Sequence, residues 1–270
     1  MRVDLHTHTD CSDGKLTPDE LISRALDRKV SLLSITDHDT LSAYSALKSI
    51  PAEITLVPGI EFSCRWKKLE IHIVGLSIDL ANPVMQKAVA DQKQARLIRA
   101  RQIAEHLEKQ GVPDAFDGAA QIAGNDNIGR PHFAAFLIGA GVCKSTTEAF
   151  KKYLSIKNLA RYWPEVSTSI EWIRGAGGIA VLAHPLKYKL TRTRLNLLLD
   201  DFQAAGGRAM EVISGKQLEW QTRDMASLCI KRGLLASCGS DFHQPDLSWA
   251  ELADITPLPG DCEPVWKHFA

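Results

Sequence analysis

Short apolar segments alternate with amphipathic helical segments along most of this 270-residue chain, and this alternation constrains the fold more than any other feature. Seven apolar segments each end on polar residues, a pattern typical of strands that are buried on both faces. Alternating strands and helices indicate a parallel sheet, and seven strands at this length favour a closed or nearly closed α/β barrel. The predicted strands are 3–5, 32–35, 54–62, 71–74, 179–182, 209–213 and 234–237, and the main helices between them are 18–29, 168–175, 192–205 and 218–232.

One long segment interrupts the alternation, because residues 82–154 contain helical patterns only. These patterns cover residues 86–110, 117–123, 132–140 and 146–154. An insertion after the fourth strand would overhang the face at which barrel active sites lie. The sequence therefore predicts a barrel domain made of residues 1–81 and 155–270, with an inserted helical lid subdomain at 82–154.

Charge and composition exclude several classes of protein. The chain has 32 Lys and Arg against 32 Asp and Glu, and this balance argues against a nucleic-acid coat protein or a polybasic membrane binder. No apolar run approaches the ~18 residues of a membrane span, and the N-terminus lacks the apolar region of a signal peptide. The six cysteines form no C-x-x-C pair, which indicates reduced thiols and a cytoplasmic protein.

The first predicted strand ends in an H-x-H motif, His6 and His8, and Asp13 lies on the loop that follows. Residues two apart on a strand point to the same side, so both imidazoles can bind one ion. An H-x-H pair alone is weak evidence, because a structural role explains it equally well. Likewise His72 by itself indicates a core histidine, and Glu61 by itself indicates a surface carboxylate.

The distribution of His, Asp and Glu over the predicted strands is stronger evidence than any single residue. Six of the seven predicted strands carry such a residue at or near the C-terminal end, where a parallel barrel gathers its loops. Buried charges of this kind must be paired or bound to a metal. The candidate metal ligands are His6, His8, Asp13, His38, Glu61, His72, His184, Asp241 and His243.

Nine candidate ligands exceed the four that one tetrahedral ion takes, which implies two or three ions. Mixed imidazole and carboxylate ligands suit manganese, iron or zinc better than calcium or magnesium. A bridging carboxylate such as Glu61 would hold two ions at the ~3.5–4 Å spacing of hydrolytic metal pairs.

The motifs that carry these ligands form a series along the chain: His6-Thr-His8 with Ser12-Asp13-Gly14, Thr36-Asp37-His38-Asp39, Gly59-Ile60-Glu61, His72-Ile-Val-Gly75, Ala183-His184-Pro185 and Gly239-Ser-Asp-Phe-His243. This series resembles the PHP (polymerase and histidinol phosphatase) family over nearly the whole chain. The insertion, with Gly129-Arg-Pro-His132 and Arg96-Leu-Ile-Arg-Ala-Arg101, resembles one branch of that family. That branch contains nucleoside 3′,5′-bisphosphate phosphatases and 5′→3′ exoribonucleases.

The resemblance implies a distorted (β/α)7 TIM-like barrel and a site for three divalent ions, usually manganese, with zinc or iron as alternatives. It implies substrates that are nucleoside 3′,5′-bisphosphates or 5′-phosphorylated RNA ends, with no membrane and no obligate protein partner. It implies a first ion on His6, His8, Glu61 and Asp241, a second that shares Glu61 and adds His72 and His184, and a third on Asp13, His38 and His243.

We therefore expect phosphoester hydrolysis by a metal-bound hydroxide, with Asp13 in the catalytic set and no serine or cysteine nucleophile. Arg130 and His132 follow Gly129 at the start of a predicted helix. The planar guanidinium of arginine matches a phosphate, and His132 could contact phosphate or protonate the leaving oxygen. The alternative is a surface arginine and a helix-packing histidine.

A row of basic residues in the insertion has two interpretations. Lys93, Arg96 and Arg99 lie on one helical face, and Arg101 is displaced around the helix. Taken alone, the row indicates a solvated face. Under the bisphosphate hypothesis, Arg96, Arg99 and Arg101 would bind the second phosphate of the substrate.

Two other functions remain open. One is another hydrolase, either a histidinol-phosphate phosphatase or an amidohydrolase, although the strand-end motifs carry a glutamate and no lysine as the candidate bridge. The other is a non-catalytic metal-binding regulatory module, against which the intact ligand series argues.

Overall fold

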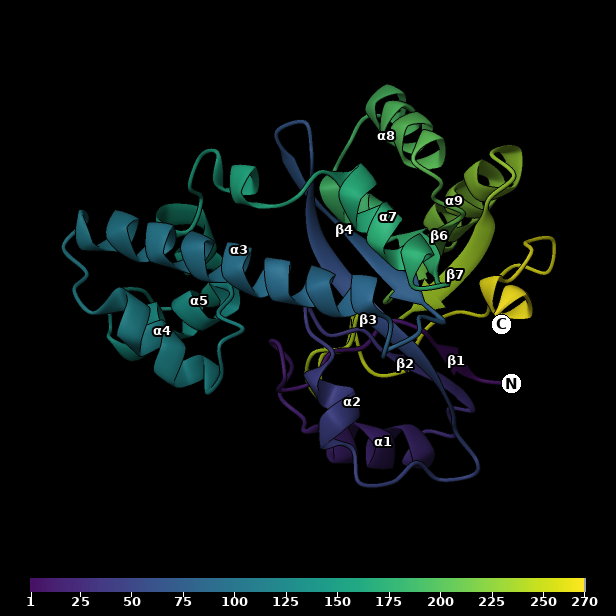
Figure 1. The fold of residues 1–270 in the computed structure, drawn as a ribbon, viewed down its shortest axis with the longest axis horizontal. Helices are drawn as coiled ribbons and strands as arrows, with labels where there is room; N and C mark the ends of the chain where they lie inside the picture. The colour runs from purple at the N-terminus through teal and green to yellow at the C-terminus, as the bar shows by residue number, and fades with distance from the viewer. Residues whose placement is uncertain (270) are drawn as a thin grey trace.

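The computed structural model describes residues 1–269, and a seven-stranded sheet forms its centre, with the strands in chain order from β1 to β7 (Figure 1). Strands β1 and β2, β2 and β3, β5 and β6, and β6 and β7 pair in parallel. The strands are β1 (Val3–Asp4), β2 (Leu32–Ile35), β3 (Thr55–Trp66), β4 (Leu69–Leu76), β5 (Ile179–Leu182), β6 (Ala209–Ser214) and β7 (Leu235–Gly239). The predicted α/β barrel is confirmed.

The direction of the fourth strand corrects the expectation of an entirely parallel sheet, because β4 is antiparallel to both β3 and β5. The predicted strands stopped at residue 62 and restarted at residue 71. In the structure β3 runs on to Trp66 and β4 begins at Leu69, so that only Lys67 and Lys68 form the turn. A parallel crossover needs a dozen or more residues, so a connection this short forms a hairpin.

The sheet closes between the segments that follow β1 and β7. The amide of Leu5 donates to the carbonyl of Cys238 at 3.1 Å, and the amide of Asp241 donates to the carbonyl of His6 at 2.9 Å. Gly239 permits this approach, because a Cβ there would lie 2.4 Å from Cβ of His6. The closing seam therefore brings the first and last candidate ligands side by side.

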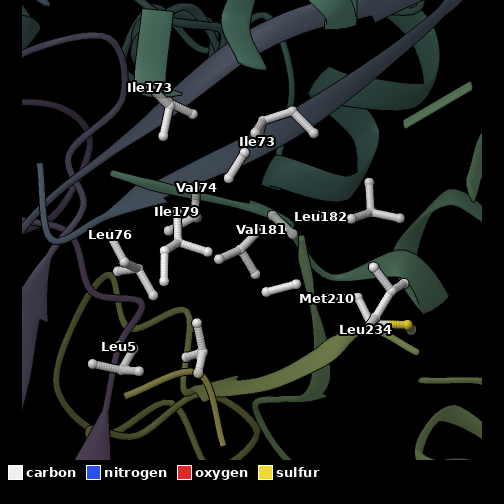
Figure 2. Packing of buried hydrophobic residues seen from close by; sticks show 14 of the residues in the cluster. Leu5, Ile73, Val74, Leu76, Ile173, Ile179, Val181, Leu182, Met210 and Leu234 are labelled. Carbon is white, nitrogen blue, oxygen red and sulfur yellow. The ribbon is translucent and has the colours of Figure 1, made fainter. Parts of the chain in front are cut away.

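Aliphatic side chains fill the barrel and the space beneath its helices. Figure 2 shows Leu5, Ile73 of β4 and Val181 of β5 in one cluster with Ile173 of α7 (Val166–Gly175). All four are at most 1% exposed. Burying a side chain of this size stabilises the fold by roughly 1.5–3 kcal/mol, so the barrel has a rigid core under its ligand-bearing edge.

The helices around the barrel begin and end at recognisable signals. In α1 the side chain of Thr17 caps the amide of Glu20, and Glu20 reciprocates at the amide of Thr17, with Pro18 at the first helical position. The helices of the barrel are α1 (Pro18–Asp27), α2 (Ser42–Ala46), α7, α8 (Arg192–Ala204) and α9 (Glu219–Lys231), with 3₁₀ turns η3 (Pro185–Tyr188) and η4 (Val265–His268). Helices α1, α7, α8 and α9 match the predicted segments to within two residues, whereas the short helix α2 was not predicted.

The segment between β4 and β5 is helical: α4 and α5 lie to one side of the sheet, away from α8 and α9, and α3 extends from them to the barrel at α7 (Figure 1). It has a hydrophobic cluster of its own that includes Ile103, Leu107, Phe133 and Leu137. Its elements are α3 (Pro83–Glu108), α4 (Ala115–Ala123), α5 (Arg130–Gly139), α6 (Thr146–Glu148), the π-helical turn η1 (Ala149–Tyr153) and the 3₁₀ turn η2 (Leu159–Tyr162).

Within residues 1–269, no helix combines the length and the apolar character needed to cross a membrane.

Candidate metal centre

The structure brings all nine candidate ligands to one edge of the barrel. His6, His8 and Asp13 follow β1, His38 follows β2, and His184 follows β5, while Asp241 and His243 follow β7; Glu61 lies in β3 and His72 in β4. The position of His72 depends on the reversed strand. Because β4 is antiparallel, its first half lies level with the end of β5, and the amide of Ala183 donates to the carbonyl of His72 at 3.2 Å.

The possible ligand atoms form three overlapping groups, and within each group the atoms lie within 4.8 Å of one another. One group is the predicted first set. A second group is the predicted third set with His8 added. The remaining group has His38 in place of His184 in the predicted second set. His184 contacts the same carboxylate as His72, with Nε2 of His184 and Nδ1 of His72 each 3.0 Å from Oε1 of Glu61. The groups are His6, His8, Glu61 and Asp241; His8, Asp13, His38 and His243; and His38, Glu61 and His72.

The donor geometry around Glu61 fits bound cations. Oε2 of Glu61 lies 3.2 Å from Nε2 of His6, 3.3 Å from Nε2 of His8 and 3.1 Å from Nδ1 of His38. Despite these distances, this oxygen has no hydrogen bond of acceptable geometry in the described part of the chain, and neither has Nδ1 of His38. Buried polar atoms are normally paired, so converging unpaired donor atoms point to an ion that would hold them.

Charge stabilises the ionised form of Glu61, which is fully buried. Burial on its own raises a carboxyl pKa, but the neighbouring imidazoles of His38, His6 and His72 hold the pKa of Glu61 well below its usual range. The carboxylate is therefore an anion at neutral pH, as a bridging ligand requires.

Glu211 on β6 orients two of the histidines, and the sequence reasoning missed it. Nδ1 of His6 lies 2.5 Å from Oε1 of Glu211, and the amide of His184 donates to Oε2 at 2.6 Å. When Nδ1 of His6 donates its proton to the carboxylate, the lone pair of Nε2 faces the cluster, as metal binding needs. Burial lowers the pKa of His6, but the carboxylates of Glu211 and Glu61 together raise it to about 10, so a metal would displace the proton on Nε2 of the metal-free ring.

Buried carboxylates also fix the loops that carry the ligands. Asp37 accepts from the amide of Thr9 at 2.7 Å and from the hydroxyl of Ser12 at 2.6 Å, which holds the loop between His8 and Asp13. Asp4 accepts from the amide of Ser240 at 2.8 Å, next to Asp241. Neither carboxylate was among the predicted site residues, although Asp37 stands inside the quoted motif beside His38.

Three non-glycine residues at this edge have positive φ: Asp39 at 56°, His184 at 28° and Asp241 at 54°. Such conformations are costly for residues with a side chain, and they persist where the surroundings over-determine them. Two of the three are candidate ligands and the third follows His38. These three are among eleven such residues in the described part of the chain, so backbone strain is present at the ligand-bearing loops without being confined to them.

Arg96 ties the insertion to the barrel through Asp39. Nε of Arg96 donates to Oδ2 of Asp39 at 3.1 Å, and the amide of Ser63 and Nε2 of Gln92 donate to Oδ1 at 2.8 Å and 2.7 Å. Arg96 is only 6% exposed. Its charge is therefore already paired, and α3 is joined to the loop after His38.

Arg99 and Arg130 share a single carboxylate, Glu70 of β4, at 3.0 Å and 3.3 Å. Arg99 is buried and stacks on Trp163 with 4.8 Å between guanidinium carbon and ring centroid, whereas a third of the Arg130 side chain is exposed. Nε2 of His72 lies 4.0 Å from the same carboxylate. Two cations on one anion leave a net positive charge directly beside the cluster.

The remaining basic residues of the insertion lie elsewhere. Lys93 is exposed and pairs with Asp126, so the interpretation as a solvated face holds for Lys93 and not for Arg96 and Arg99. Arg101 is exposed, and its guanidinium lies over the ring of Phe116 at 4.8 Å, within the insertion. The structure does not bring Arg101 to the cluster.

His132 is buried near the predicted ligands and has a defined orientation. Its Nδ1 accepts the amide proton of Gly129 at 2.9 Å, so in the neutral ring the proton is on Nε2. Burial and the positive charges of Arg96 and Lys15 lower the pKa of His132, although Asp13 opposes the shift. A ring that is neutral at pH 7 is better suited to donate a hydrogen bond than to deliver a proton.

Lys187 also reaches the cluster, although the sequence reasoning found no lysine among the strand-end motifs. It lies three residues beyond His184 in η3, and its Nζ forms an ion pair with Oδ2 of Asp241. Its position three residues after His184 is the sequence signal by which Lys187 could have been identified.

Comparison with known proteins agrees with this geometry. Residues 4–223 match the model of the PHP domain, and the chain belongs to the PHP family. It is 42% identical to the 5′-3′ exoribonuclease Rnm of Salmonella typhimurium, over 98% of this chain and 93% of that protein. It is 39% identical to the 3′,5′-nucleoside bisphosphate phosphatase of Chromobacterium violaceum, over 99% of this chain and 96% of that protein.

A solved structure from Chromobacterium violaceum, described as an amidohydrolase with bound sulfate and no metal, has a TM-score of 0.91 and 38% identity. The alignment covers 100% of this chain and 96% of that one. The predicted family is thereby confirmed, as is the predicted enzyme class, a hydrolase that acts on phosphoester bonds.

Proposed function

We propose that this enzyme hydrolyses the 3′-phosphate ester of nucleoside 3′,5′-bisphosphates and removes 5′-terminal nucleotides from short RNA by the same reaction. The observation that carries the proposal is the position of the Glu70–Arg99–Arg130 group against His72. A metal-ligand cluster suited to one phosphate is flanked by a net positive charge suited to another. Relatives about 40% identical over nearly the full chain are named for these two activities.

The ligands would hold divalent ions in three sets, for which manganese suits the mixed imidazole and carboxylate donors best, with zinc or iron as alternatives. Such ions, when bound, acidify water and offset the charge on phosphate. The sets are His6, His8, Glu61 and Asp241; Glu61, His72 and His184; and Asp13, His38 and His243. The 4.8 Å grouping of their atoms includes all of the first set and, with His8 added, all of the third. Of the second set it includes Glu61 and His72, and Nε2 of His184 lies 3.0 Å from Oε1 of Glu61.

The chain's own residues position the substrate. Arg130, the exposed member of the pair on Glu70, would bind the 5′-phosphate, and Arg99 would support its charge. Nε2–H of His132 would donate to an oxygen of the scissile phosphate. Arg96, whose charge is paired with Asp39, would keep the insertion in place, and we do not include Arg101 in the phosphate site.

Residues 82–154 would form an inserted lid subdomain, and residues 1–81 and 155–270 would form the barrel domain. The separate hydrophobic cluster of the insertion supports this division. The free thiols of all six cysteines are consistent with a cytoplasmic enzyme.

The test uses manganese-loaded protein and measures phosphate release from adenosine 3′,5′-bisphosphate and from histidinol phosphate, amine release from an amide substrate, and nucleotide release from a 5′-phosphorylated RNA. We expect turnover of the bisphosphate and the RNA, with at least a hundredfold lower kcat/KM on the other two compounds. Preference for histidinol phosphate or for the amide would replace the proposal with one of the two alternative hydrolases.

A further inference from the structure

A cavity of about 390 Å³ opens beside the metal-ligand cluster, between the loops that follow β5, β6 and β7. Three of the candidate ligands line it, namely His184, Asp241 and His243. The insertion reaches the cluster at other loops: Asn127, between α4 and α5, donates to the carbonyl of His38 at 2.6 Å. A substrate bound at the cluster therefore has a further space to enter, and Arg130 is not among the residues that line it. The volume lies in the range of small-ligand sites.

The wall of this cavity carries polar atoms that lack partners. Nδ1 of His184 and Oγ of Ser214 are buried and have no hydrogen bond in the described part of the chain. His184 is 6% exposed. Because its Nε2 faces Glu61, the Nδ1–H is free to donate to a ligand. Unpaired buried donors are costly in a folded protein, so these two groups would gain from a polar ligand that reaches them.

The rim of the cavity carries an aromatic surface and the wall a cation. Trp249 lines the cavity and is 62% exposed, while its carbonyl accepts from the amide of Lys216 at 2.8 Å, which fixes its backbone. Lys187 lies between the cavity and the cluster, on Asp241. An exposed tryptophan provides a surface on which proteins that bind single-stranded nucleic acid stack a base.

We infer that this cavity, here named the β5–β7 pocket, binds the second nucleotide of an RNA substrate, with its base on Trp249. The inference rests on the proposed function. In the proposed reaction, water adds across the P–O3′ bond of the first nucleotide at the metal-ligand cluster. The O3′ leaves with a proton as a hydroxyl, and the phosphate keeps the oxygen of the water. In a bisphosphate that phosphate ends in free oxygens, whereas in RNA one oxygen continues to the O5′ of the next nucleotide. The β5–β7 pocket gives that nucleotide a place, so it determines specificity for RNA over bisphosphate.

A binding experiment tests the pocket without catalysis. The probe is a 5′-phosphorylated RNA tetramer with 2-aminopurine at the second position and a hydrolysis-resistant first linkage, added to the full chain. We expect the 2-aminopurine fluorescence to fall at least twofold on the wild type and on Trp220→Ala, and to stay constant on Trp249→Ala. Trp220 is the matched control because it is 63% exposed on α9 and does not line the pocket.

Kinetics give a second measure. For Trp249→Ala we expect kcat/KM on the RNA to fall about tenfold relative to kcat/KM on adenosine 3′,5′-bisphosphate, and the ratio to be unchanged for Trp220→Ala. Equal losses on both substrates, or no loss on RNA, would overturn the pocket assignment. Fluorescence quenching that depends on Trp249 in a protein that hydrolyses neither substrate would support the pocket and reject the proposed function. Quenching that is equal in all three proteins would reject the pocket whatever the activity.

Discussion

The ligand-bearing edge of the barrel and the junction with the insertion both bury charged side chains, but they satisfy them in different ways. At the edge, three imidazole nitrogens lie within 3.3 Å of Oε2 of Glu61 without forming a hydrogen bond. At the junction, Arg96 and Arg99 are each paired with a carboxylate, Asp39 and Glu70, and both lie over the ring of Trp163.

This difference separates the chemistry of the enzyme from its architecture. At the edge, the crowded oxygen and nitrogen atoms have no hydrogen-bond partners, so a bound cation would satisfy them. Arginines paired with carboxylates and stacked on an aromatic ring join the insertion to the barrel. Arg130, partly exposed and sharing Glu70 with Arg99, lies where the two regions meet.

The largest effect is expected at the edge, from Glu61→Gln. The amide keeps the shape of the side chain but removes the charge that the imidazoles surround, so bound metal falls and kcat drops at least ~10³-fold. Metal content and turnover are the measurements, with circular dichroism to establish folding. Glu165→Gln is the control, a surface carboxylate paired with Arg65, and it should retain the wild-type rate. A folded Glu61→Gln enzyme with normal metal content would show that cation binding at this edge does not depend on the charge of Glu61.

The junction should respond in stability. Arg96→Met leaves Asp39 buried without its cation, and we expect the free energy of unfolding to fall by about 3 kcal/mol. Lys93→Met, one turn earlier on α3, breaks an exposed pair with Asp126 and should cost less than about 1 kcal/mol. Urea titration of the metal-free proteins measures both. Equal losses for the two variants would mean that burial of the Arg96 pair is not what fixes the insertion.

A smaller effect is expected from the carboxylate that orients a candidate ligand. Glu211→Gln weakens the acceptor that fixes the orientation of His6, and we expect manganese affinity or kcat/KM to fall about 10–100-fold. Isothermal titration with manganese measures the affinity. If the variant binds manganese like the wild type and turns over at the same rate, the carboxylate serves the fold of β6 and not the orientation of the ligand.

The smallest effect is expected where the two regions meet. Arg130→Ala should lower kcat/KM for adenosine 3′,5′-bisphosphate about tenfold and change kcat/KM for adenosine 3′-phosphate less than twofold. Only the bisphosphate has a 5′-phosphate that Arg130 can bind. Arg101→Ala, an exposed arginine of the same insertion, should change neither substrate. A loss of equal size on both substrates would place Arg130 at the scissile phosphate.

Pattern and spacing predicted much of this molecule because they act locally. The seven strands and the helical insertion follow from apolar periodicity, which requires no knowledge of distant contacts. The ligand motifs were found because parallel strands bring their ends to one edge, so that residues from 6 to 243 can be assigned to one site. The direction of β4 was missed because its pairing extends through half-buried residues at the hairpin that do not look like a buried strand.

What the sequence determined by itself is the barrel, the insertion and the identity of the nine candidate ligands. Tertiary structure alone decided which buried charges have partners. Glu211 and Asp4 are single carboxylates in apolar strands, and Arg96 and Arg99 belong to a basic helix that could equally face solvent. The free energy of a buried charge depends on the groups that pack against it from other elements. Only the folded chain therefore shows that Arg96 is paired with Asp39, whereas Oε2 of Glu61 has no hydrogen bond and is available to a cation.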